Sequence, residues 1–238
     1  MLVSGEEGWI RPDPSCFELR ERVPVPTFSD KLKTAEKHLA RVDRTMARLI
    51  RDIGPCALRP LRWSPYESLT RAIAHQQLNG RAAQTILGRF VALYPGQRFP
   101  EPHDVLATHF ARLRSVGFSR NKVTAIRDIA AKARDGIVPS RAQARRLDDE
   151  ELILRLVEIY GVGRWTVEML LIFTLGRLDV LPVDDFGIQS GFSAAYRLRR
   201  RPTKADFQRV TDCWQPFRSV GSWYLWRHAD GLKNKKLL

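Results

Sequence analysis

Residues 147–188 read LDDEELILRLVEIYGVGRWTVEMLLIFTLGRLDVLPVDDFGI. The pattern predicts two helices, because apolar residues recur at steps of three and four on both sides of a glycine pair and acidic residues crowd the start of the first helix. Gly161 and Gly163 allow a turn too tight for side chains, which leaves backbone N–H groups and the N-terminus of the second helix facing outward. Such a hairpin predicts a phosphate-binding site, although glycine also ends many helices for packing reasons alone.

Two carboxylates follow the second helix, in the segment Leu-Pro-Val-Asp-Asp-Phe at 181–186. They come after an apolar run and a proline, at the point where Phe-Gly-Ile-Gln predicts the start of another helix. An aspartate at such a start accepts hydrogen bonds from the first N–H groups of the helix. One of Asp184 and Asp185 is therefore expected to be its N-cap.

These residues resemble the helix-hairpin-helix DNA glycosylase superfamily, and within it the bacterial 3-methyladenine DNA glycosylase II branch. The shared motifs are Gly-Val-Gly-Arg-Trp-Thr at 161–166, Leu-Pro-x-Asp-Asp-aromatic at 181–186, Trp-Gln-Pro-Phe-Arg-Ser at 214–219 and Arg-Ala-Ile-Ala-His-Gln-Gln-Leu at 71–78. With Trp226, they cover roughly residues 32–226 in the family's order. No single short motif would justify the assignment, so it is their common order that supports the resemblance.

The resemblance implies an all-α fold of two helical lobes, with the helix-hairpin-helix motif on one rim and a pocket between the lobes. It divides the chain into an N-terminal arm, residues 1–29, and a glycosylase domain, residues 30–238. The N-terminal β domain of the branch has little room before Ser29, so we expect it to be reduced or absent. We also expect the chain to cross between the lobes.

Composition and charge limit the possible functions. The 238 residues are 44% hydrophobic, enough for a core, and contain no apolar run long enough to cross a bilayer and no signal peptide. We therefore expect a cytoplasmic, nucleoid-associated monomer without a membrane partner. The net charge of +14, from 40 Lys and Arg against 26 Asp and Glu, predicts a polyanionic partner, here double-stranded DNA.

The three cysteines, Cys16, Cys56 and Cys213, are widely spaced. This spacing predicts neither a disulfide framework nor a cysteine metal site. Some superfamily members bind an iron–sulfur cluster through four closely spaced C-terminal cysteines, and this sequence does not contain them. We expect no cofactor and no catalytic metal, while the resemblance implies a monovalent cation at the hairpin.

The first half of the chain is predicted to be helical. Apolar spacing predicts one long helix from Ser29 to Arg51, ended by Gly54 and Pro55. Ser-Pro-Tyr-Glu at 64–67 combines a capping box with proline at the first helical position, which predicts a helix start there.

The polar loop His-Gln-Gln-Leu-Asn-Gly at 75–80 is expected to break this helix. By itself, such a cluster is equally an amide network that satisfies buried backbone groups. The resemblance implies instead that the loop supplies a wedge, which enters the duplex where the damaged base has left and offsets the cost of unstacking. The match falls on Gln77, with Leu78 as the neighbouring candidate.

Two more helices are predicted at 104–113 and 120–134, with Gly117 closing the first and Ser119 capping the second. The resemblance places this turn close to the DNA backbone, with Lys122 as a phosphate contact. A solvent-exposed lysine in the first turn of a helix is the alternative.

The resemblance assigns catalysis to one aspartate. Alkylation at N3 of adenine or N7 of guanine makes the leaving base cationic, so its departure needs little acid and positive charge develops on the sugar. A nearby carboxylate stabilises this oxocarbenium ion and can orient water. Alignment on the following helix selects Asp185, whereas alignment on Pro182 and Val183 would select Asp184. We favour Asp185, since a helix start fixes side-chain direction, and Asp184 is then expected to be the N-cap or a hydrogen-bond partner.

Three side chains are expected to form the base pocket. Trp165 stands two residues after the second hairpin glycine, where bifunctional members carry the lysine that forms a Schiff base. Its indole could instead attract a cationic base. Met169 lies one turn further on, where the branch often has tyrosine, and Trp226 matches the family's aromatic residue that faces the catalytic aspartate.

The sequence thus predicts a monofunctional base-excision glycosylase that flips and removes 3-methyladenine and 7-methylguanine from duplex DNA and leaves an abasic site. Two alternatives are a glycosylase for neutral lesions such as uracil, hypoxanthine or an oxidised purine, and a non-catalytic DNA-binding module. The aspartate and the two tryptophans argue against the module, because phosphate binding needs none of them. The hairpin residues expected to bind phosphate are Gly161, Gly163, Arg164 and Thr166.

Overall fold

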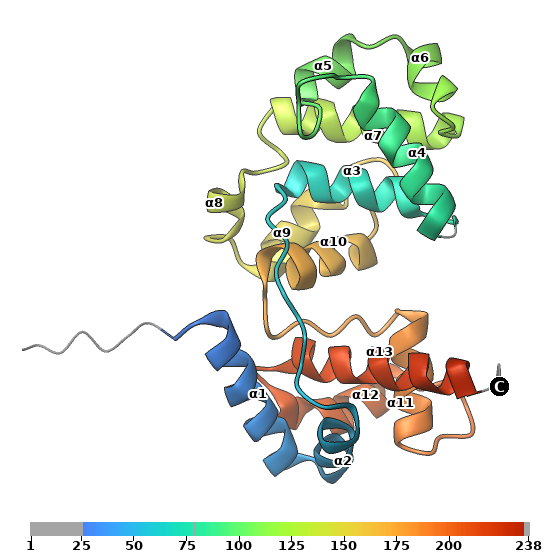
Figure 1. Cartoon of the computed structure of the whole chain (residues 1–238). Coiled ribbons are helices and arrows are strands. Elements are labelled where there is room, and N and C mark those ends of the chain that lie inside the picture. The colour runs from blue at the N-terminus through green and yellow to red at the C-terminus, as the bar shows by residue number, and fades with distance from the viewer. Residues whose placement is uncertain (1–25, 79, 236–238) are drawn as a thin grey trace, which may run out of the picture.

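The computed structural model describes residues 26–78 and 80–235, and within these ranges it contains helices and no strands. Figure 1 shows two lobes joined by two extended crossings of the chain. The predicted all-α, two-lobed architecture is confirmed. Most of the predicted N-terminal arm lies outside the described residues, and so does the segment for which a reduced or absent β domain was predicted. None of the helices in the described ranges has the length and apolar character needed to span a bilayer.

One lobe contains both ends of the helical chain, and we call it the end lobe. Its first helix begins at Phe28, before the predicted boundary at residue 30, because Thr27 and Asp30 form a capping box. Its last helix packs against three others, α1, α2 and α11. The end lobe consists of α1 (Phe28–Val42), α2 (Arg44–Ile53), α11 (Phe186–Ala195), α12 (Lys204–Thr211), the 3₁₀ turn η3 (Asp212–Trp214) and α13 (Arg218–Lys235).

The middle of the chain forms the second lobe, the middle lobe. Its first helix begins where the sequence predicts, because Ser64 Oγ accepts the Glu67 N–H at 3.1 Å and Pro65 occupies the first turn. The middle lobe consists of α3 (Pro65–His75), α4 (Gly80–Ala92), α5 (Pro102–Ala107), α6 (Phe110–Ser115), α7 (Arg120–Arg134), α8 (Arg141–Ala144), α9 (Asp149–Leu156), α10 (Arg164–Leu170) and a π-helical turn that continues it, η2 (Leu171–Leu175).

The prediction of one long helix from Ser29 to Arg51 is wrong, because Asp43 divides this segment into α1 and α2. The Asp43 backbone is extended, and its Oδ1 accepts the N–H groups of Thr45 and Met46 at 2.7 and 3.2 Å. Its Oδ2 accepts the Trp214 indole N–H at 2.9 Å. The apolar spacing continues across the break, so periodicity alone could not show it.

The helix predicted at 104–113 is also divided, into α5 and α6, at Thr108. The turn that follows matches its prediction. Gly117 has a φ of 113°, which favours glycine, and Ser119 Oγ accepts the Lys122 N–H at 3.3 Å as the N-cap of α7.

The chain crosses between the lobes twice, at residues 54–64 and 176–185, as expected. The first crossing is fixed by Arg141, whose guanidinium donates to the carbonyl oxygens of Leu61 and Trp63. The second is fixed on the start of α13, where Arg218 forms a two-pronged ion pair with Asp179 at 2.8 and 2.9 Å. These contacts set the position of the residues that follow the second crossing.

Candidate active site

The glycine hairpin between α9 and α10 packs tightly against the middle lobe. Gly161 has a φ of 79°, and a Cβ there would lie 3.2 Å from the Cβ of Ala125 on α7. The Tyr160 N–H donates to Asp128, also on α7, at 2.7 Å. Gly163 is instead the N-cap of α10 and has open space around it. One glycine therefore faces inward, while the other lies beside the first N–H groups of α10, which have no acceptor within the helix.

Asp185 brings two of the three predicted pocket residues, Trp165 and Trp226, together at the lobe junction. Its Oδ2 accepts the indole N–H of Trp165 on α10, and its Oδ1 accepts that of Trp226 on α13, both at 2.8 Å. Oδ1 also accepts the Ile188 N–H at 2.8 Å, which makes Asp185 the N-cap of α11. Of the two roles expected for Asp184, N-cap or hydrogen-bond partner, the first is therefore wrong. The Asp184 side chain is exposed, because it precedes the fixed helix start.

The surroundings of Trp226 include two residues that the sequence reading did not identify. Phe173 stacks at a tilt on the Trp226 ring, with 5.5 Å between the ring centroids. A Cβ on Gly187 would lie 2.8 Å from Trp226 and 3.1 Å from Asp185 Oδ1. One turn on, a Cβ at Gly191 would lie 2.2 Å from the Leu225 carbonyl oxygen. These two glycines let α11 approach α13, and their four-residue spacing was the signal available in the sequence.

Trp165 and Phe186 are the exposed large side chains beside Asp185, with 43% and 74% of their surfaces accessible. Trp226 is only partly exposed. One carboxylate oxygen thus accepts from a partly buried indole and the other from an exposed one.

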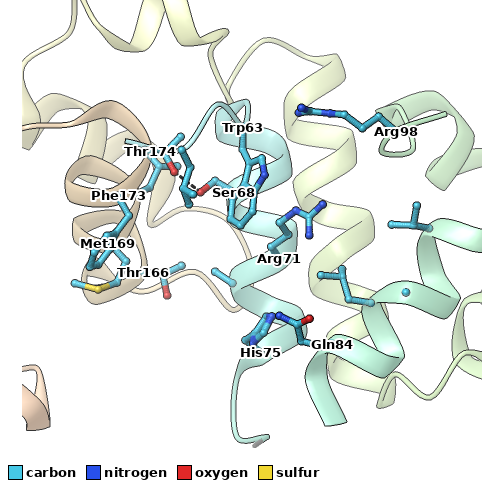
Figure 2. A pocket seen from close by; sticks show the side chains of 16 residues that line it. Trp63, Ser68, Arg71, His75, Gln84, Arg98, Thr166, Met169, Phe173 and Thr174 are labelled. Atoms are coloured by element: carbon cyan, nitrogen blue, oxygen red, sulfur yellow. Dashed lines mark hydrogen bonds between the residues drawn. The ribbon is translucent and has the colours of Figure 1, made fainter. Parts of the chain in front are cut away.

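Met169 lines a cleft of about 580 Å³ in the middle lobe. Figure 2 shows Met169 and Phe173 on one side of the cleft and Arg71 and His75, from α3, on another. The Arg71 guanidinium lies 4.5 Å from the centroid of the Trp63 ring, a cation–π contact. Burial lowers the pKa of His75, and the charges of Arg71 and Lys122 add to this shift. The cleft borders the tryptophan pair through Phe173, but neither tryptophan lines it.

Two of the predicted phosphate-binding side chains have protein partners. Arg164 forms a two-pronged ion pair with Glu150, at 2.9 and 2.6 Å, and its Nε lies 3.3 Å from Glu168. Lys122 donates to two backbone carbonyl oxygens of the middle lobe. Thr166 is 4% exposed and lies in the wall of the cleft, rather than on the outer face of the hairpin. The phosphate contacts of all three remain predictions.

Glu168 is a buried acid that was not predicted from the sequence. A glutamate in a helix is ordinarily expected to be exposed to solvent, even where its neighbours are apolar. It is 7% exposed, and burial raises its pKa to about 7 although the Arg164 guanidinium favours the charged form. The negative charge of Asp184 adds to the increase.

The predicted wedge lies beside the hairpin. Gln77 is exposed with a φ of 56°, and Leu78 is 39% exposed. The neighbouring Gln76 donates its side-chain N–H to the Gly161 carbonyl oxygen at 3.1 Å. A hydrogen bond therefore joins the loop that carries the predicted wedge to the inner glycine of the hairpin.

The hairpin offers one main-chain oxygen with a spare lone pair to a monovalent cation. The Gly161 carbonyl oxygen accepts one hydrogen bond, from Gln76, whereas the Gly163 oxygen accepts two, from the Thr166 N–H at 2.9 Å and the Val167 N–H at 3.3 Å, and a carbonyl has two lone pairs. A neutral oxygen such as that of Gly161 suits a hard monovalent cation, and the predicted ion stays a prediction. Among the described residues, no group of three or more His, Cys, Asp or Glu side chains is arranged to hold a metal.

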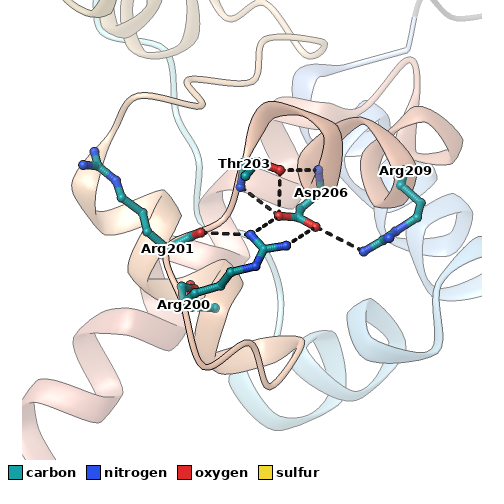
Figure 3. A network of polar contacts seen from close by, with 6 residues as sticks. Arg200, Arg201, Thr203, Asp206 and Arg209 are labelled. Carbon is teal, nitrogen blue, oxygen red and sulfur yellow. Dashed lines mark hydrogen bonds and ion pairs between the residues drawn. The ribbon is translucent and has the colours of Figure 1, made fainter.

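Part of the positive charge at 197–201 is used inside the end lobe. Figure 3 shows Arg200 paired with Asp206 through two contacts, at 2.6 and 3.0 Å, while Arg209 reaches the same carboxylate at 3.2 Å. Arg200 and the Thr203 cap hold the pKa of the Asp206 carboxyl far below its usual range. Arg201 donates to Gln189 on α11 at 2.6 Å. These contacts shape the loop before α12.

The sequence matches a known protein family. A family model described as HhH-GPD superfamily base excision DNA repair protein covers residues 70–216. DNA-3-methyladenine glycosylase 1 of Schizosaccharomyces pombe is 42% identical over 215 residues, which make up 89% of this chain and 92% of that protein.

The fold matches solved structures of similarly named proteins. An S. pombe 3-methyladenine DNA glycosylase in complex with abasic DNA aligns with a TM-score of 0.73 at 41% identity, over 82% of this chain and 95% of that chain. A DNA-3-methyladenine glycosidase from Bacillus halodurans aligns with a TM-score of 0.75 at 30% identity, over 84% of this chain and 90% of that chain.

Proposed function

Because the chain belongs to the HhH-GPD superfamily of base excision DNA repair proteins, we propose that it is a DNA glycosylase that removes alkylated bases from duplex DNA. The resemblance read from the sequence motifs is thereby confirmed at the level of the family, and DNA-3-methyladenine glycosylase 2 of Escherichia coli is among the more distant relatives. The names of the relatives support an alkylated purine as the substrate, and the abasic DNA bound to one of them supports DNA binding.

The observation that carries the proposal is the Asp185 carboxylate, held between two indole N–H groups from different lobes. Its two oxygens and the helix start fix the direction of the negative charge before substrate arrives. Such a preorganised charge stabilises the oxocarbenium ion that develops on the sugar when the base departs. Trp165, the more exposed indole, is the one placed to move aside when a nucleotide enters.

The aromatic faces around this carboxylate suit a cationic base. Trp165, Trp226 and Phe173 lie together at the lobe junction. A positively charged alkylpurine is attracted by aromatic rings, whereas the normal neutral base gains less. The positive charge of the alkylated base therefore makes the base a better leaving group and also allows the aromatic rings to recognise it.

The chain is proposed to be monofunctional. In bifunctional members a lysine amine attacks the sugar, and the corresponding position here is Trp165, whose indole cannot form a Schiff base. Water then completes the reaction and the product is an abasic site in an unbroken strand. The chain would act as a monomer, and a monovalent cation held in part by the Gly161 carbonyl oxygen would add positive charge at the hairpin.

The test is the release of bases from methylated duplex DNA. We expect free 3-methyladenine and 7-methylguanine, together with strands that break only after alkali. Salt-dependent DNA binding without any base release would overturn the assignment to alkylated bases. Release of uracil, hypoxanthine or an oxidised purine alone would instead place the enzyme among glycosylases for neutral lesions.

A further inference from the structure

The loop that carries Gln77 and Leu78 has a shape that depends on contacts from outside it. Gln77 has a φ of 56°, an uncommon conformation for a residue other than glycine. Such a conformation persists where the surrounding structure fixes it. Within the part of the loop that the structure describes, the Leu78 N–H donates to the His75 carbonyl oxygen at 3.3 Å.

Lys122 on α7 supplies the strongest outside contacts. Its Nζ donates to the carbonyl oxygens of Ala74 at 2.8 Å and Gln76 at 2.7 Å. Carbonyl groups in the last turn of a helix lack intrahelical partners, and the helix dipole favours a cation there. The ammonium has three donors, and two of them point at the loop backbone. Burial lowers the pKa of Lys122, in accord with an ammonium turned away from solvent.

A second contact joins the same loop to the hairpin. The Gln76 side chain donates to the Gly161 carbonyl oxygen at 3.1 Å, and Gly161 in turn packs against Ala125 on α7. A small cleft of about 380 Å³ lies among these residues, with Lys122 and Gln77 in its walls. The loop, the first turns of α7 and the hairpin therefore form a single polar junction.

We propose that Lys122 is a positioning residue, which holds the wedge loop in the shape that enters the duplex and, through Gln76, fixes the wedge relative to the hairpin. The inference rests on the proposed glycosylase function. It assigns Lys122 to base extrusion instead of phosphate neutralisation, because the donors of its ammonium are directed at carbonyl oxygens. A wedge whose position is fixed before binding loses less conformational entropy when it replaces the departing base.

The two roles for Lys122 differ in what they change. Loss of a phosphate contact lowers the dependence of DNA affinity on salt, by about one unit of the log–log slope, and weakens binding to all sequences alike. Loss of a wedge support slows base extrusion. It therefore slows excision most where the lesion is stably paired, and least where the opposite base is missing and extrusion costs little.

The experiment compares Lys122→Met with Arg120→Met, which removes the same charge from an exposed position in the same helical turn. Single-turnover excision is measured with one lesion placed opposite its normal partner or opposite an abasic site. We expect Lys122→Met to slow excision of the paired lesion by about tenfold and of the unpaired lesion by less than about twofold, with the salt slope unchanged. Arg120→Met should keep the paired-to-unpaired ratio of the wild type.

Equal slowing on both substrates by Lys122→Met, or a salt slope lowered by about one, would overturn the proposal. Thermal unfolding of each variant shows whether it is folded. Gln76→Leu provides a second test in case Lys122→Met does not fold, since it removes only the tie to the hairpin. It should also slow the paired lesion selectively, and an unchanged ratio would contradict the link between wedge and hairpin.

Failure of the proposed function gives a different result. In that case the wild type releases no base from either duplex. Wedge insertion can still be followed by 2-aminopurine paired with thymine in the duplex, because its fluorescence rises when it is unstacked. A smaller rise with Lys122→Met than with Arg120→Met supports the positioning role, and equal rises refute it.

Discussion

The Asp185 carboxylate accepts hydrogen bonds from Ile188 N, Trp165 Nε1 and Trp226 Nε1, each 2.8 Å long. A hydrogen bond to a charged acceptor contributes about 1.5–3 kcal/mol, more than one between neutral groups. Because Trp165 belongs to the middle lobe and Trp226 to the end lobe, the direction of the carboxylate depends on how the two lobes meet. Substitutions at the indoles should therefore affect the chemical step more than DNA binding.

Replacing Trp226 with phenylalanine keeps an aromatic ring and removes the N–H donor. We expect Trp226→Phe to slow single-turnover base release by about tenfold, which corresponds to roughly 1.4 kcal/mol. Trp165→Phe should slow it less, since Trp165 is 43% exposed and water can replace its hydrogen bond. Rapid-quench kinetics on one defined lesion measures both effects. Equal rates for wild type and Trp226→Phe would show that the indole N–H does not orient the carboxylate.

Glu168 gives a prediction about pH. Its pKa is raised from 4.5 to about 7 in the folded state, mainly by burial. The folded protein then retains a proton that the unfolded chain releases, so this contribution to stability is complete below pH 4.5 and is lost as the pH rises to about 7. In the wild type, this pH dependence lowers the free energy of unfolding by an amount on the order of 3 kcal/mol, and we expect Glu168→Gln to abolish the decrease. Urea denaturation below and above this window checks it, and parallel pH profiles for variant and wild type would contradict it.

Among individual residues, the motifs predicted that Asp185 lies beside Trp226, but they did not predict which aspartate caps the following helix. The sequence predicted Asp185 as the catalytic acid and Asp184 as the N-cap or a hydrogen-bond partner, whereas Asp185 is itself the N-cap of α11. It did not identify Glu168 or Gly187, because burial of an acid and the close approach of α13 depend on contacts between segments distant in sequence.

At the element scale, the two glycines of the hairpin have different roles. Gly161 has a φ of 79° and is crowded by Ala125, whereas Gly163 has an ordinary negative φ and open space. We expect Gly161→Ala to lower the free energy of unfolding by about 1–3 kcal/mol. Gly163→Ala should change it by less than about 1 kcal/mol and weaken DNA binding instead, because the added methyl group lies beside the outward N–H groups.

Differential scanning calorimetry and DNA titration measure the two effects separately. If Gly163→Ala binds DNA like the wild type, the outer face of the hairpin is not a phosphate site. If Gly161→Ala unfolds at the wild-type temperature, the close packing of the hairpin on α7 contributes little to stability.

Elements with strong local signals were predicted well, and those that depend on distant partners were not. The starts of α3 and α7 followed from Ser64 and Ser119, whose caps are local. The break at Asp43 was missed, because the carboxylate that makes it is also held by Trp214, far along the chain. Apolar periodicity continued through the break and concealed it.

At the scale of the whole molecule, the net charge of +14 should govern DNA affinity. This net charge already counts every acidic residue, so internal ion pairs such as Arg200 with Asp206 and Arg164 with Glu150 leave it unchanged, although they occupy arginines that could otherwise contact phosphates. We expect the dissociation constant for duplex DNA to rise at least about tenfold between 50 and 200 mM salt. Fluorescence anisotropy at several salt concentrations gives the slope, and a flat dependence would exclude phosphate contacts as the main source of affinity.

The two-lobed architecture was predictable because its motifs occur in the family's order along the chain. The meeting of the lobes was not, since it depends on the two crossings and on pairs such as Arg218 with Asp179. The resemblance implied Met169 as a pocket residue, but the rest of the cleft that Met169 lines with Arg71 had no sequence signal, because its walls come from helices separated along the chain.

The central claim is that Asp185 performs the chemistry. It is tested most directly by single-turnover base release from a duplex with one defined alkylated purine, comparing wild type, Asp185→Asn and Asp184→Asn at matched DNA occupancy. We expect Asp185→Asn to be at least about a hundredfold slower and Asp184→Asn to stay within about threefold of the wild type. A wild-type rate for Asp185→Asn, or a larger loss for Asp184→Asn, would contradict the account.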